Sequence, residues 1–194
     1  MLAFSNSASA DATIMPPVKG GKLPAISLPI PKNPVERSYL GLVGNGYFKI
    51  SQIKAEAVII KIFNTYCPAC LTVALAMPEL YHRIENEPEL KGKMKVIGIG
   101  AGNTAYEIEV FKETFNIPYP VFPDSDFSLH KAFGEVRTPY FIAARIKEDG
   151  SNEVLYTQLG AFTETGQFLD LVLEAYGKKP KESSKGEVFG RVDL

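Results

Sequence analysis

Residues 57–70 read AVIIKIFNTYCPAC, and this stretch decides the fold of the chain. Its first half, Ala57 to Phe63, is β-branched and almost continuously apolar, which is typical of a strand that is buried on both faces. Its second half carries the only two cysteines of the chain, Cys67 and Cys70, and opens a segment whose apolar residues have helical spacing. A cysteine pair at a strand-to-helix junction favours a functional pair of thiols.

This junction favours thiol–disulfide exchange for two physical reasons. A thiolate at the N-terminus of a helix is stabilised by the helix dipole and by unpaired N–H groups, so we expect the pKa of Cys67 to lie below the ordinary thiol value of about 8.5. Two cysteines three residues apart on a first helical turn can also form a disulfide without a large backbone movement. We therefore expect Cys67 to attack a partner disulfide and Cys70 to resolve the resulting mixed disulfide.

Three other interpretations of the cysteine pair are less favoured. Half of a zinc site would need further ligands, but the sequence has no second CxxC motif, and His82 and His130 lack ligand spacing. An inert structural disulfide is compatible with an exported protein, and two unreactive core thiols are the third interpretation. We expect no metal and no cofactor other than the redox-active Cys67–Cys70 disulfide itself.

Composition and charge exclude several classes of partner. The chain has 194 residues, of which 21 are basic and 22 acidic, so nothing in its charge favours nucleic acid or an anionic membrane. No window reaches the about 18 uninterrupted apolar residues that cross a membrane. The expected partners are protein thiols and disulfides, together with an upstream redox donor.

The two ends of the chain differ from its middle. Ala8-Ser9-Ala10 has the small-x-small pattern of a signal-peptidase site, which predicts an exported, periplasmic or extracytoplasmic protein, with an ordinary terminus as the alternative. An anchor lost with the removed N-terminus is compatible with this prediction. We predict a leader remnant and a proline-rich extended segment over residues 1–34, a compact domain over residues 35–176 and a polar tail over residues 177–194.

Strand and helix patterns alternate through the compact domain. The predicted strands cover residues 47–51, 57–63, 94–100, 119–122, 140–146 and 153–159, and the predicted helices cover residues 67–87, 104–115, 128–133 and 163–176. Thr104 and Glu107 have the spacing of a capping box, and Pro78 should kink the first helix because it removes a backbone donor. This order predicts an α/β fold whose mixed central sheet is flanked by helices, with parallel middle strands, an antiparallel last pair and an N-terminal β-hairpin extension.

The CPAC motif after a buried strand resembles the thioredoxin fold. Within that fold, the chain is similar to the TlpA/ResA-like exported thiol–disulfide oxidoreductases and their AhpC/TSA relatives. The resemblance covers roughly residues 40–176. It rests further on the next parallel strand at Val96–Gly100, an insert strand at Tyr119–Asp124 and a loop-to-strand segment at Val136–Ile142.

The resemblance implies a substrate site around the dithiol. In this family the proline aligned with Pro139 is cis, which would leave the backbone groups of Thr138 free to pair with an extended partner chain. Tyr66, Pro68 and Ala69 complete the expected substrate-binding residues. The resemblance also implies protein disulfides as substrates and cytochrome c maturation as a pathway.

Departures from the family leave the handling of protons open. Thioredoxins commonly carry Trp before the first cysteine, where this chain has Tyr66, and a buried Asp six residues before it, where this chain has Lys61. ResA-like reductases often have an acidic residue at the position of Val73. Lys61 is interpreted first as a strand-end lysine that reaches solvent, and second as a cation that lowers a thiol pKa. Glu79 could replace the missing carboxylate, although an exposed helix glutamate is the favoured interpretation.

Two other functions stand as alternatives to a thiol–disulfide oxidoreductase. Peroxidases of the AhpC/TSA type resemble one another through P-x-x-x-[ST]-x-x-C, but Ile60 and Asn64 occupy the Pro and hydroxyl positions relative to Cys67. A non-enzymatic chaperone for a metal or haem could use the dithiol as a ligand pair, although it would lack a third ligand such as a suitably placed histidine.

Overall fold

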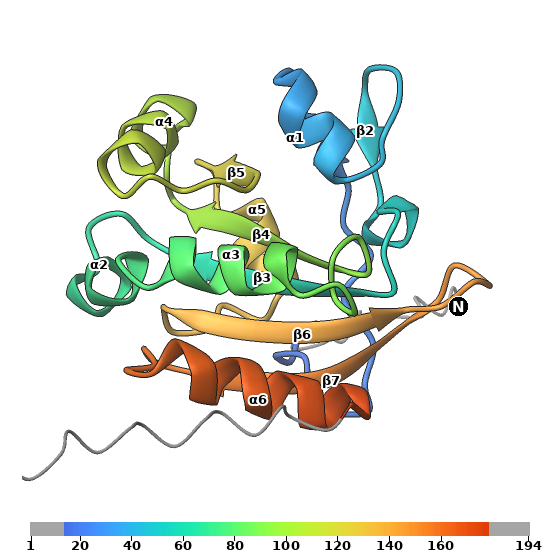
Figure 1. Cartoon of the computed structure of the whole chain (residues 1–194). Helices are drawn as coiled ribbons and strands as arrows, with labels where there is room; N and C mark the ends of the chain where they lie inside the picture. The colour runs from blue at the N-terminus through green and yellow to red at the C-terminus, as the bar shows by residue number, and fades with distance from the viewer. Residues whose placement is uncertain (1–13, 179–194) are drawn as a thin grey trace, which may run out of the picture.

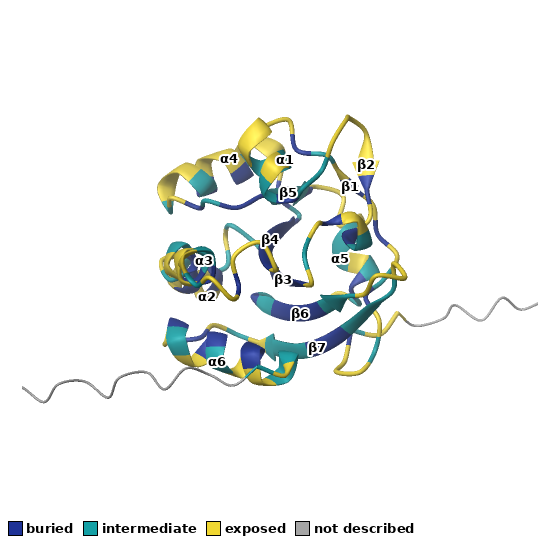
Figure 2. Ribbon diagram, turned by 45° about the vertical axis from the view of Figure 1, so that its right-hand side comes forward, coloured by how far each residue is buried: buried dark blue, intermediate teal, exposed yellow. Residues whose placement is uncertain are grey.

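The computed structural model describes residues 14–178, which form a five-stranded mixed sheet with its covering elements (Figure 1). The strands are β3 (Ala57–Phe63), β4 (Met94–Ala101), β5 (Val121–Asp124), β6 (Tyr140–Ile146) and β7 (Asn152–Leu159), in the spatial order β5-β4-β3-β6-β7. The first three are parallel, whereas β6 runs antiparallel to both β3 and β7. Every residue of β3 and β4 is buried, so these two strands form the middle of the core (Figure 2).

Each face of the sheet has its own core. The face of Ile59 and Phe63 packs on α2 (Pro68–Ala74), α3 (Met77–Asn86), α4 (Ala105–Thr114) and α6 (Thr165–Tyr176). The opposite face, which carries Ile60 and Ile62, packs on α5 (Ser128–Ala132), the 3-10 helix η1 (Ile50–Gln52) and the N-terminal segment. This separation follows from the alternation of side chains along a strand. It places the CPAC motif, on α2, over the first face.

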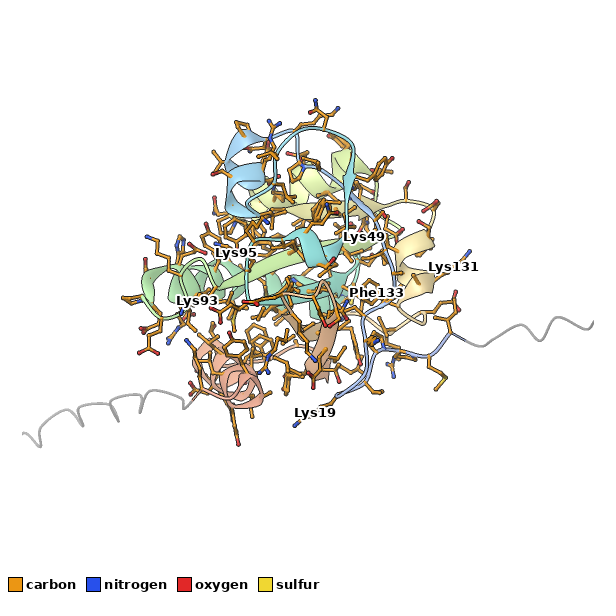
Figure 3. All side chains as sticks on the ribbon, turned by 90° about the vertical axis from the view of Figure 1, so that its right-hand side faces the viewer. Lys19, Lys49, Lys93, Lys95, Lys131 and Phe133 are labelled. Atoms are coloured by element: carbon orange, nitrogen blue, oxygen red, sulfur yellow. The ribbon has the colours of Figure 1, made fainter. Side chains whose placement is uncertain are left out.

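The N-terminal segment lies along the second face and one edge of the sheet. Its buried apolar residues are Leu23, Ile26 and Leu28. Gly20 N donates to Val154 O and Val154 N donates to Gly21 O, both at 2.8 Å, so the segment pairs with the outer edge of β7 at Val154. Figure 3 shows it passing beside the labelled Phe133. The described part of this proline-rich stretch is therefore packed against the domain.

A small two-stranded antiparallel sheet joins this segment to the domain. It pairs β1 (Leu28–Pro29) with β2 (Tyr47–Phe48). The helix α1 (Pro34–Tyr39) connects the two strands along the chain. The helix begins where the Asn33 side chain accepts a hydrogen bond from Val35 N at 2.9 Å and Pro34 occupies the first turn.

The predicted fold class is confirmed. The sheet is mixed, its middle strands are parallel and its last pair is antiparallel, as the alternation of elements predicted. The capping box is also confirmed, because the Thr104 side chain accepts from Glu107 N while the Glu107 carboxylate accepts from Thr104 N. Both strands with the strongest apolar runs, β3 and β4, end within one residue of the prediction.

Some local predictions are wrong. The single kinked helix over residues 67–87 is two helices, because Pro78 starts α3 in its first turn, where no intrahelical N–H bond is lost. The predicted strand 47–51 ends at Phe48 and continues as η1, so its hairpin partner is the distant β1 and the two strands share no tight turn. The α1 helix was missed because it has only six residues and none of them is buried, so it shows no apolar period.

Parts of the predicted organisation fall outside the described residues. These are the leader remnant at residues 1–10 and the tail from residue 179 onward, and the domain boundaries remain predictions. Within residues 14–178, no helix combines the length and the apolar character needed to cross a membrane.

Candidate active site

The CPAC motif lies at the carboxyl end of the central strand β3. Cys67 is the N-cap residue of α2, with extended backbone angles (φ −82°, ψ 117°), and Pro68 occupies the first turn, where proline suits a helix start. Cys67 is partly exposed, whereas Cys70, one turn further, is fully buried against the sheet. Both cysteines are free thiols in this structure. The motif therefore presents one thiol to solvent and keeps the other inside.

The two thiols have opposite pKa shifts. Partial burial raises the pKa of Cys67, but hydrogen bonds from the Cys70 thiol and from the Cys70 and Ala69 backbone N–H groups outweigh it, so this pKa lies below its ordinary value. Burial raises the pKa of Cys70 to about 11, and the neighbouring Cys67 adds to that shift. Near neutral pH, Cys67 is the more reactive thiol, and Cys70 keeps its proton until a base removes it.

This difference predicts selective alkylation. Because only the thiolate reacts, the rate of Cys67 alkylation by iodoacetamide should rise through a midpoint below the ordinary value of about 8.5 and level off above it. Cys70 should stay unmodified in the folded protein because it is 0% exposed. Mass spectrometry of the alkylated peptides over a pH series measures both rates. A Cys67 midpoint at or above the ordinary value would contradict the prediction.

The Thr138–Pro139 loop lies directly opposite Cys67. Its peptide bond is cis, and the Cys67 thiol donates to the Thr138 carbonyl oxygen at an Sγ–O distance of 3.4 Å. A surface pocket of about 350 Å³ opens beside this contact, and Tyr66, Phe127 and Arg137 are among its lining residues. The structure thus brings the loop and the motif together at one opening, although they are 71 residues apart in the chain.

Polar side chains fix the loop that precedes Cys67. Asn103 is fully buried, and its Oδ1 accepts from Thr65 N at 3.0 Å while its Nδ2 donates to Thr65 Oγ1 at 2.7 Å. Asn64 Nδ2 donates to Ala101 O at 2.8 Å, which ties the loop to the end of β4. The Tyr66 hydroxyl donates to the Glu107 carboxylate on α4.

Asn103 was missed in the sequence. The available signal was its position, since a polar residue directly after a buried parallel strand lies at the same sheet edge as the loop after the neighbouring strand. We expect Asn103→Ala to lower the free energy of unfolding by about 1–3 kcal/mol, because it removes the two hydrogen bonds from a buried side chain that hold the partly buried Thr65. Denaturant unfolding measures this loss. The exposed Asn45→Ala serves as a control and should change stability by less than about 0.5 kcal/mol.

The favoured interpretation of Lys61, a strand-end lysine that reaches solvent, is wrong. Its side chain is 0% exposed, and the register places it between Gly98 of β4 and Phe141 of β6. Its Nζ lies 4.9 Å from the centre of the Phe63 ring and 5.6 Å from that of the Phe111 ring. The error arose because a lysine near a strand end usually extends outward, whereas this strand is central and covered by helices.

Glu79 is an exposed helix residue, as its favoured interpretation expected. It lies in the first turn of α3, where its carboxylate accepts from Arg83 Nε at 2.8 Å and from Thr165 Oγ1 at 3.0 Å. These contacts lower its pKa, with Arg83 as the largest cause, and they connect α3 to α6. A carboxylate held in this way does not replace the missing acidic residue beside the dithiol. Within residues 14–178, no three His, Cys, Asp or Glu side chains gather closely enough to hold a metal ion.

Comparisons with known proteins give the same fold and a family. A model of the AhpC/TSA family matches residues 20–149. No protein in a curated set matches the chain significantly.

Three solved structures illustrate the fold. A candidate thiol:disulfide interchange protein DsbE from Chlorobium tepidum is 18% identical, with a TM-score of 0.60 over 82% of this chain and 98% of that one. A secreted disulfide oxidoreductase of Mycobacterium tuberculosis, homologous to E. coli DsbE, is 14% identical, with a TM-score of 0.52 over 67% and 90%. StoA from Bacillus subtilis is 18% identical, with a TM-score of 0.50 over 66% and 89%.

At these identities the structural likeness establishes the fold, and the family match, which spans more than half of the chain, establishes the family. The chain belongs to the AhpC/TSA family of thioredoxin-like oxidoreductases.

Proposed function

We propose that this protein is a thiol–disulfide oxidoreductase that acts on protein disulfides through Cys67 and Cys70. The observation that carries the proposal is the asymmetry of the two thiols. One is partly exposed, has a lowered pKa and lies at an opening, while the other is buried one turn behind it with a raised pKa. Thiol–disulfide exchange needs these two roles, an attacking thiolate and a resolving thiol.

The first step is attack by Cys67. Its thiolate forms a bond to one sulfur of the partner disulfide as the partner's own S–S bond breaks, and the electron pair leaves with the second partner sulfur. The position of Cys67 at the start of α2 supports this role, since the backbone N–H groups of the first turn stabilise the thiolate that attacks.

The loop opposite Cys67 supplies a place for the partner's backbone. We assign Thr138 to pairing with an extended partner chain, because its carbonyl already lies at 3.4 Å from Cys67 Sγ. Pro139 has no N–H and so presents no donor beside the sulfurs. Tyr66, Pro68 and Ala69 are exposed around Cys67 and form the other side of the contact. Recognition of this kind uses backbone and shape, which suits a chain with a formal net charge of -1.

The second step is resolution by Cys70. Its thiolate attacks Cys67 Sγ, the mixed disulfide breaks, and the partner leaves with both of its sulfurs reduced. The Cys67–Cys70 disulfide then returns to the dithiol through an upstream donor. The reverse sequence oxidises a partner dithiol, and the reduction potential of the pair decides the direction.

A peroxidase is not favoured. At the position of the peroxidase hydroxyl, Asn64 has its Nδ2 bonded to Ala101 O and its Oδ1 bonded to Tyr66 N, so the side chain holds the loop. Ile60 faces the opposite core from Cys70. Neither residue presents a hydroxyl to Cys67.

We also propose an exported location, periplasmic or otherwise extracytoplasmic. The Ala8-Ser9-Ala10 pattern supports it, and one structural neighbour is described as secreted. Cytochrome c maturation is the pathway that the resemblance implies. Fractionation of cells that express the native gene tests the location, and recovery in the cytoplasm alone would overturn it.

The test of the proposed reaction is the reduction of insulin disulfides by dithiothreitol. The reduced wild type should accelerate the onset of insulin B-chain precipitation, and Cys67→Ser is the matched inactive control. A wild type that gives no acceleration overturns the proposed function.

A further inference from the structure

Lys61 is a buried amine on the same side of the sheet as the buried thiol. Side chains alternate along β3, so Lys61 shares its face with Ile59 and Phe63, and that face packs against Cys70. Both Lys61 and Cys70 are 0% exposed. The Cys70 and Cys67 charges, in that order of size, act on the Lys61 amine. The fold therefore places a buried amine and a buried thiol in the same core, on one face of the sheet.

Within the part of the chain that the structure describes, this amine has no hydrogen-bond partner. Of the buried side-chain nitrogen and oxygen atoms among residues 14–178, Lys61 Nζ is the one left without such a bond. The other deeply buried lysine, Lys95 (labelled in Figure 3), has Glu85 Oε1 at 3.0 Å and the Tyr39 ring at 4.1 Å. A buried polar group without a partner is costly, whereas methionine would fill a similar volume without that cost. Packing alone therefore gives no reason for a lysine at this position.

We propose that Lys61 accepts the proton of Cys70 when Cys70 resolves the mixed disulfide, a role that rests on the exchange reaction proposed above. The proton moves from Cys70 Sγ to Lys61 Nζ, so that a thiol and a neutral amine become a thiolate and an ammonium. The thiolate then forms the S–S bond to Cys67 while the bond between Cys67 and the partner breaks. The electron pair of that bond leaves with the partner sulfur, and the ammonium later returns its proton to water.

The electrostatics of the pocket support this direction of transfer. Burial lowers the pKa of Lys61 to about 8, while the Cys70 and Cys67 charges oppose the shift. In the mixed disulfide Cys67 carries no charge, so one of the two charges that favour the Lys61 ammonium is gone. The neutral amine is therefore the form of Lys61 that gains population. After transfer, the ammonium and the Cys70 thiolate attract each other in a site of low dielectric.

In the described part of the chain, no titratable group other than the two cysteines acts on Lys61. The strands on either side place Gly98 and Phe141 against it, and α4 contributes Phe111. Phe63 follows it on its own face of β3. The titratable groups that act on Lys61 are the two cysteines of the motif. The aromatic rings favour the ammonium weakly, but burial dominates the pKa.

The experiment separates the two steps of exchange. The reduced protein reacts with 5,5′-dithiobis(2-nitrobenzoate), which releases one thionitrobenzoate when Cys67 attacks and a second when Cys70 resolves the adduct. In Lys61→Met the second release should slow at least about tenfold near neutral pH, and its pH profile should move upward, because Cys70 must then lose its proton to water. The first release should change less than about threefold at alkaline pH, where Cys67 is a thiolate in both proteins.

A second variant distinguishes a proton acceptor from a fixed positive charge. Lys61→Glu places a different base at the same position, so the second release should be faster than in Lys61→Met. If Lys61 acted only as a cation, Lys61→Glu would be the slowest of the variants, and this outcome overturns the proposal. Equal second-step rates and pH profiles in wild type and Lys61→Met overturn it as well.

Controls keep the result interpretable. Lys95→Met removes a buried lysine from the start of β4 and should leave both releases within about twofold of wild type, since it lies outside the dithiol site. Melting curves establish that each variant is folded, and Lys61→Gln replaces any variant that is not. A wild type that never releases the second thionitrobenzoate overturns the proposed dithiol reaction itself, whereas a normal wild type with an unaltered Lys61→Met overturns only the role of Lys61.

Discussion

Cys67→Ser loses catalysis of insulin reduction by at least about a thousandfold, to the rate of dithiothreitol alone, because removal of a nucleophile removes the covalent step it supports. A serine hydroxyl cannot form the S–S bond through which both electrons pass. The buried Cys70 does not take over, since its side chain is 0% exposed and its pKa is raised to about 11.

The control for Cys67→Ser is its own stability. Cys67 is the N-cap residue of α2, and serine is among the best N-cap residues, so the variant should fold and unfold at a denaturant concentration close to that of wild type. If the variant is folded, its loss of activity is caused by the loss of the Cys67 sulfur. Turnover within about tenfold of wild type would remove Cys67 as the nucleophile and leave the pKa asymmetry without a catalytic purpose.

The dithiol end of the fold could be predicted because its signals are local. An apolar run rich in β-branched residues predicts a buried strand, and the first cysteine follows the end of that strand by four residues and the second by seven, so one short stretch specifies both the strand and the N-terminus of the helix. The same holds for the capping box at Thr104 and Glu107, where two side chains three residues apart satisfy each other's backbone.

Burial of Lys61 could not be predicted in this way, because it depends on residues far away in the chain. β4 and β6 cover its two sides, and α4 brings Phe111 over it. A local sequence pattern shows a charged residue near a strand end, and most lysines there reach water. Lys61 is cut off from water only by the packing of β4, β6 and α4 around it.

The helix kink predicted at Pro78 was wrong and the role of Asn103 was missed for a related reason, since each residue type is common in two different local structures. Proline either kinks a helix or begins one, and the choice depends on whether the preceding helix ends first, as α2 does after Ala74. A polar residue after a strand is usually a turn residue. Asn103 becomes structural only because Thr65 arrives beside it from the neighbouring strand's loop.

Cys70→Ser should trap the protein on its partner. The backbone N–H groups that lower the pKa of Cys67 are still present, so Cys67 attacks as before. No thiol remains to resolve the adduct. We expect a mixed disulfide with a test protein that carries one accessible disulfide, stable for hours and broken by dithiothreitol, while turnover falls by about a hundredfold or more. Non-reducing gel electrophoresis and intact mass measure the adduct.

The outcome of Cys70→Ser also decides between the dithiol mechanism and a one-thiol mechanism. A buried hydroxyl in an apolar cluster costs stability, so Cys70→Ala is the companion variant, and both should trap the same adduct. The double variant Cys67→Ser/Cys70→Ser should trap nothing. If either single Cys70 variant turned over at the wild-type rate, resolution would have to come from outside the chain. In that case the buried thiol, its raised pKa and the amine behind it would all lie off the reaction path. The adduct therefore tests more than one residue, because it shows whether the interior of this fold takes part in the chemistry at its surface.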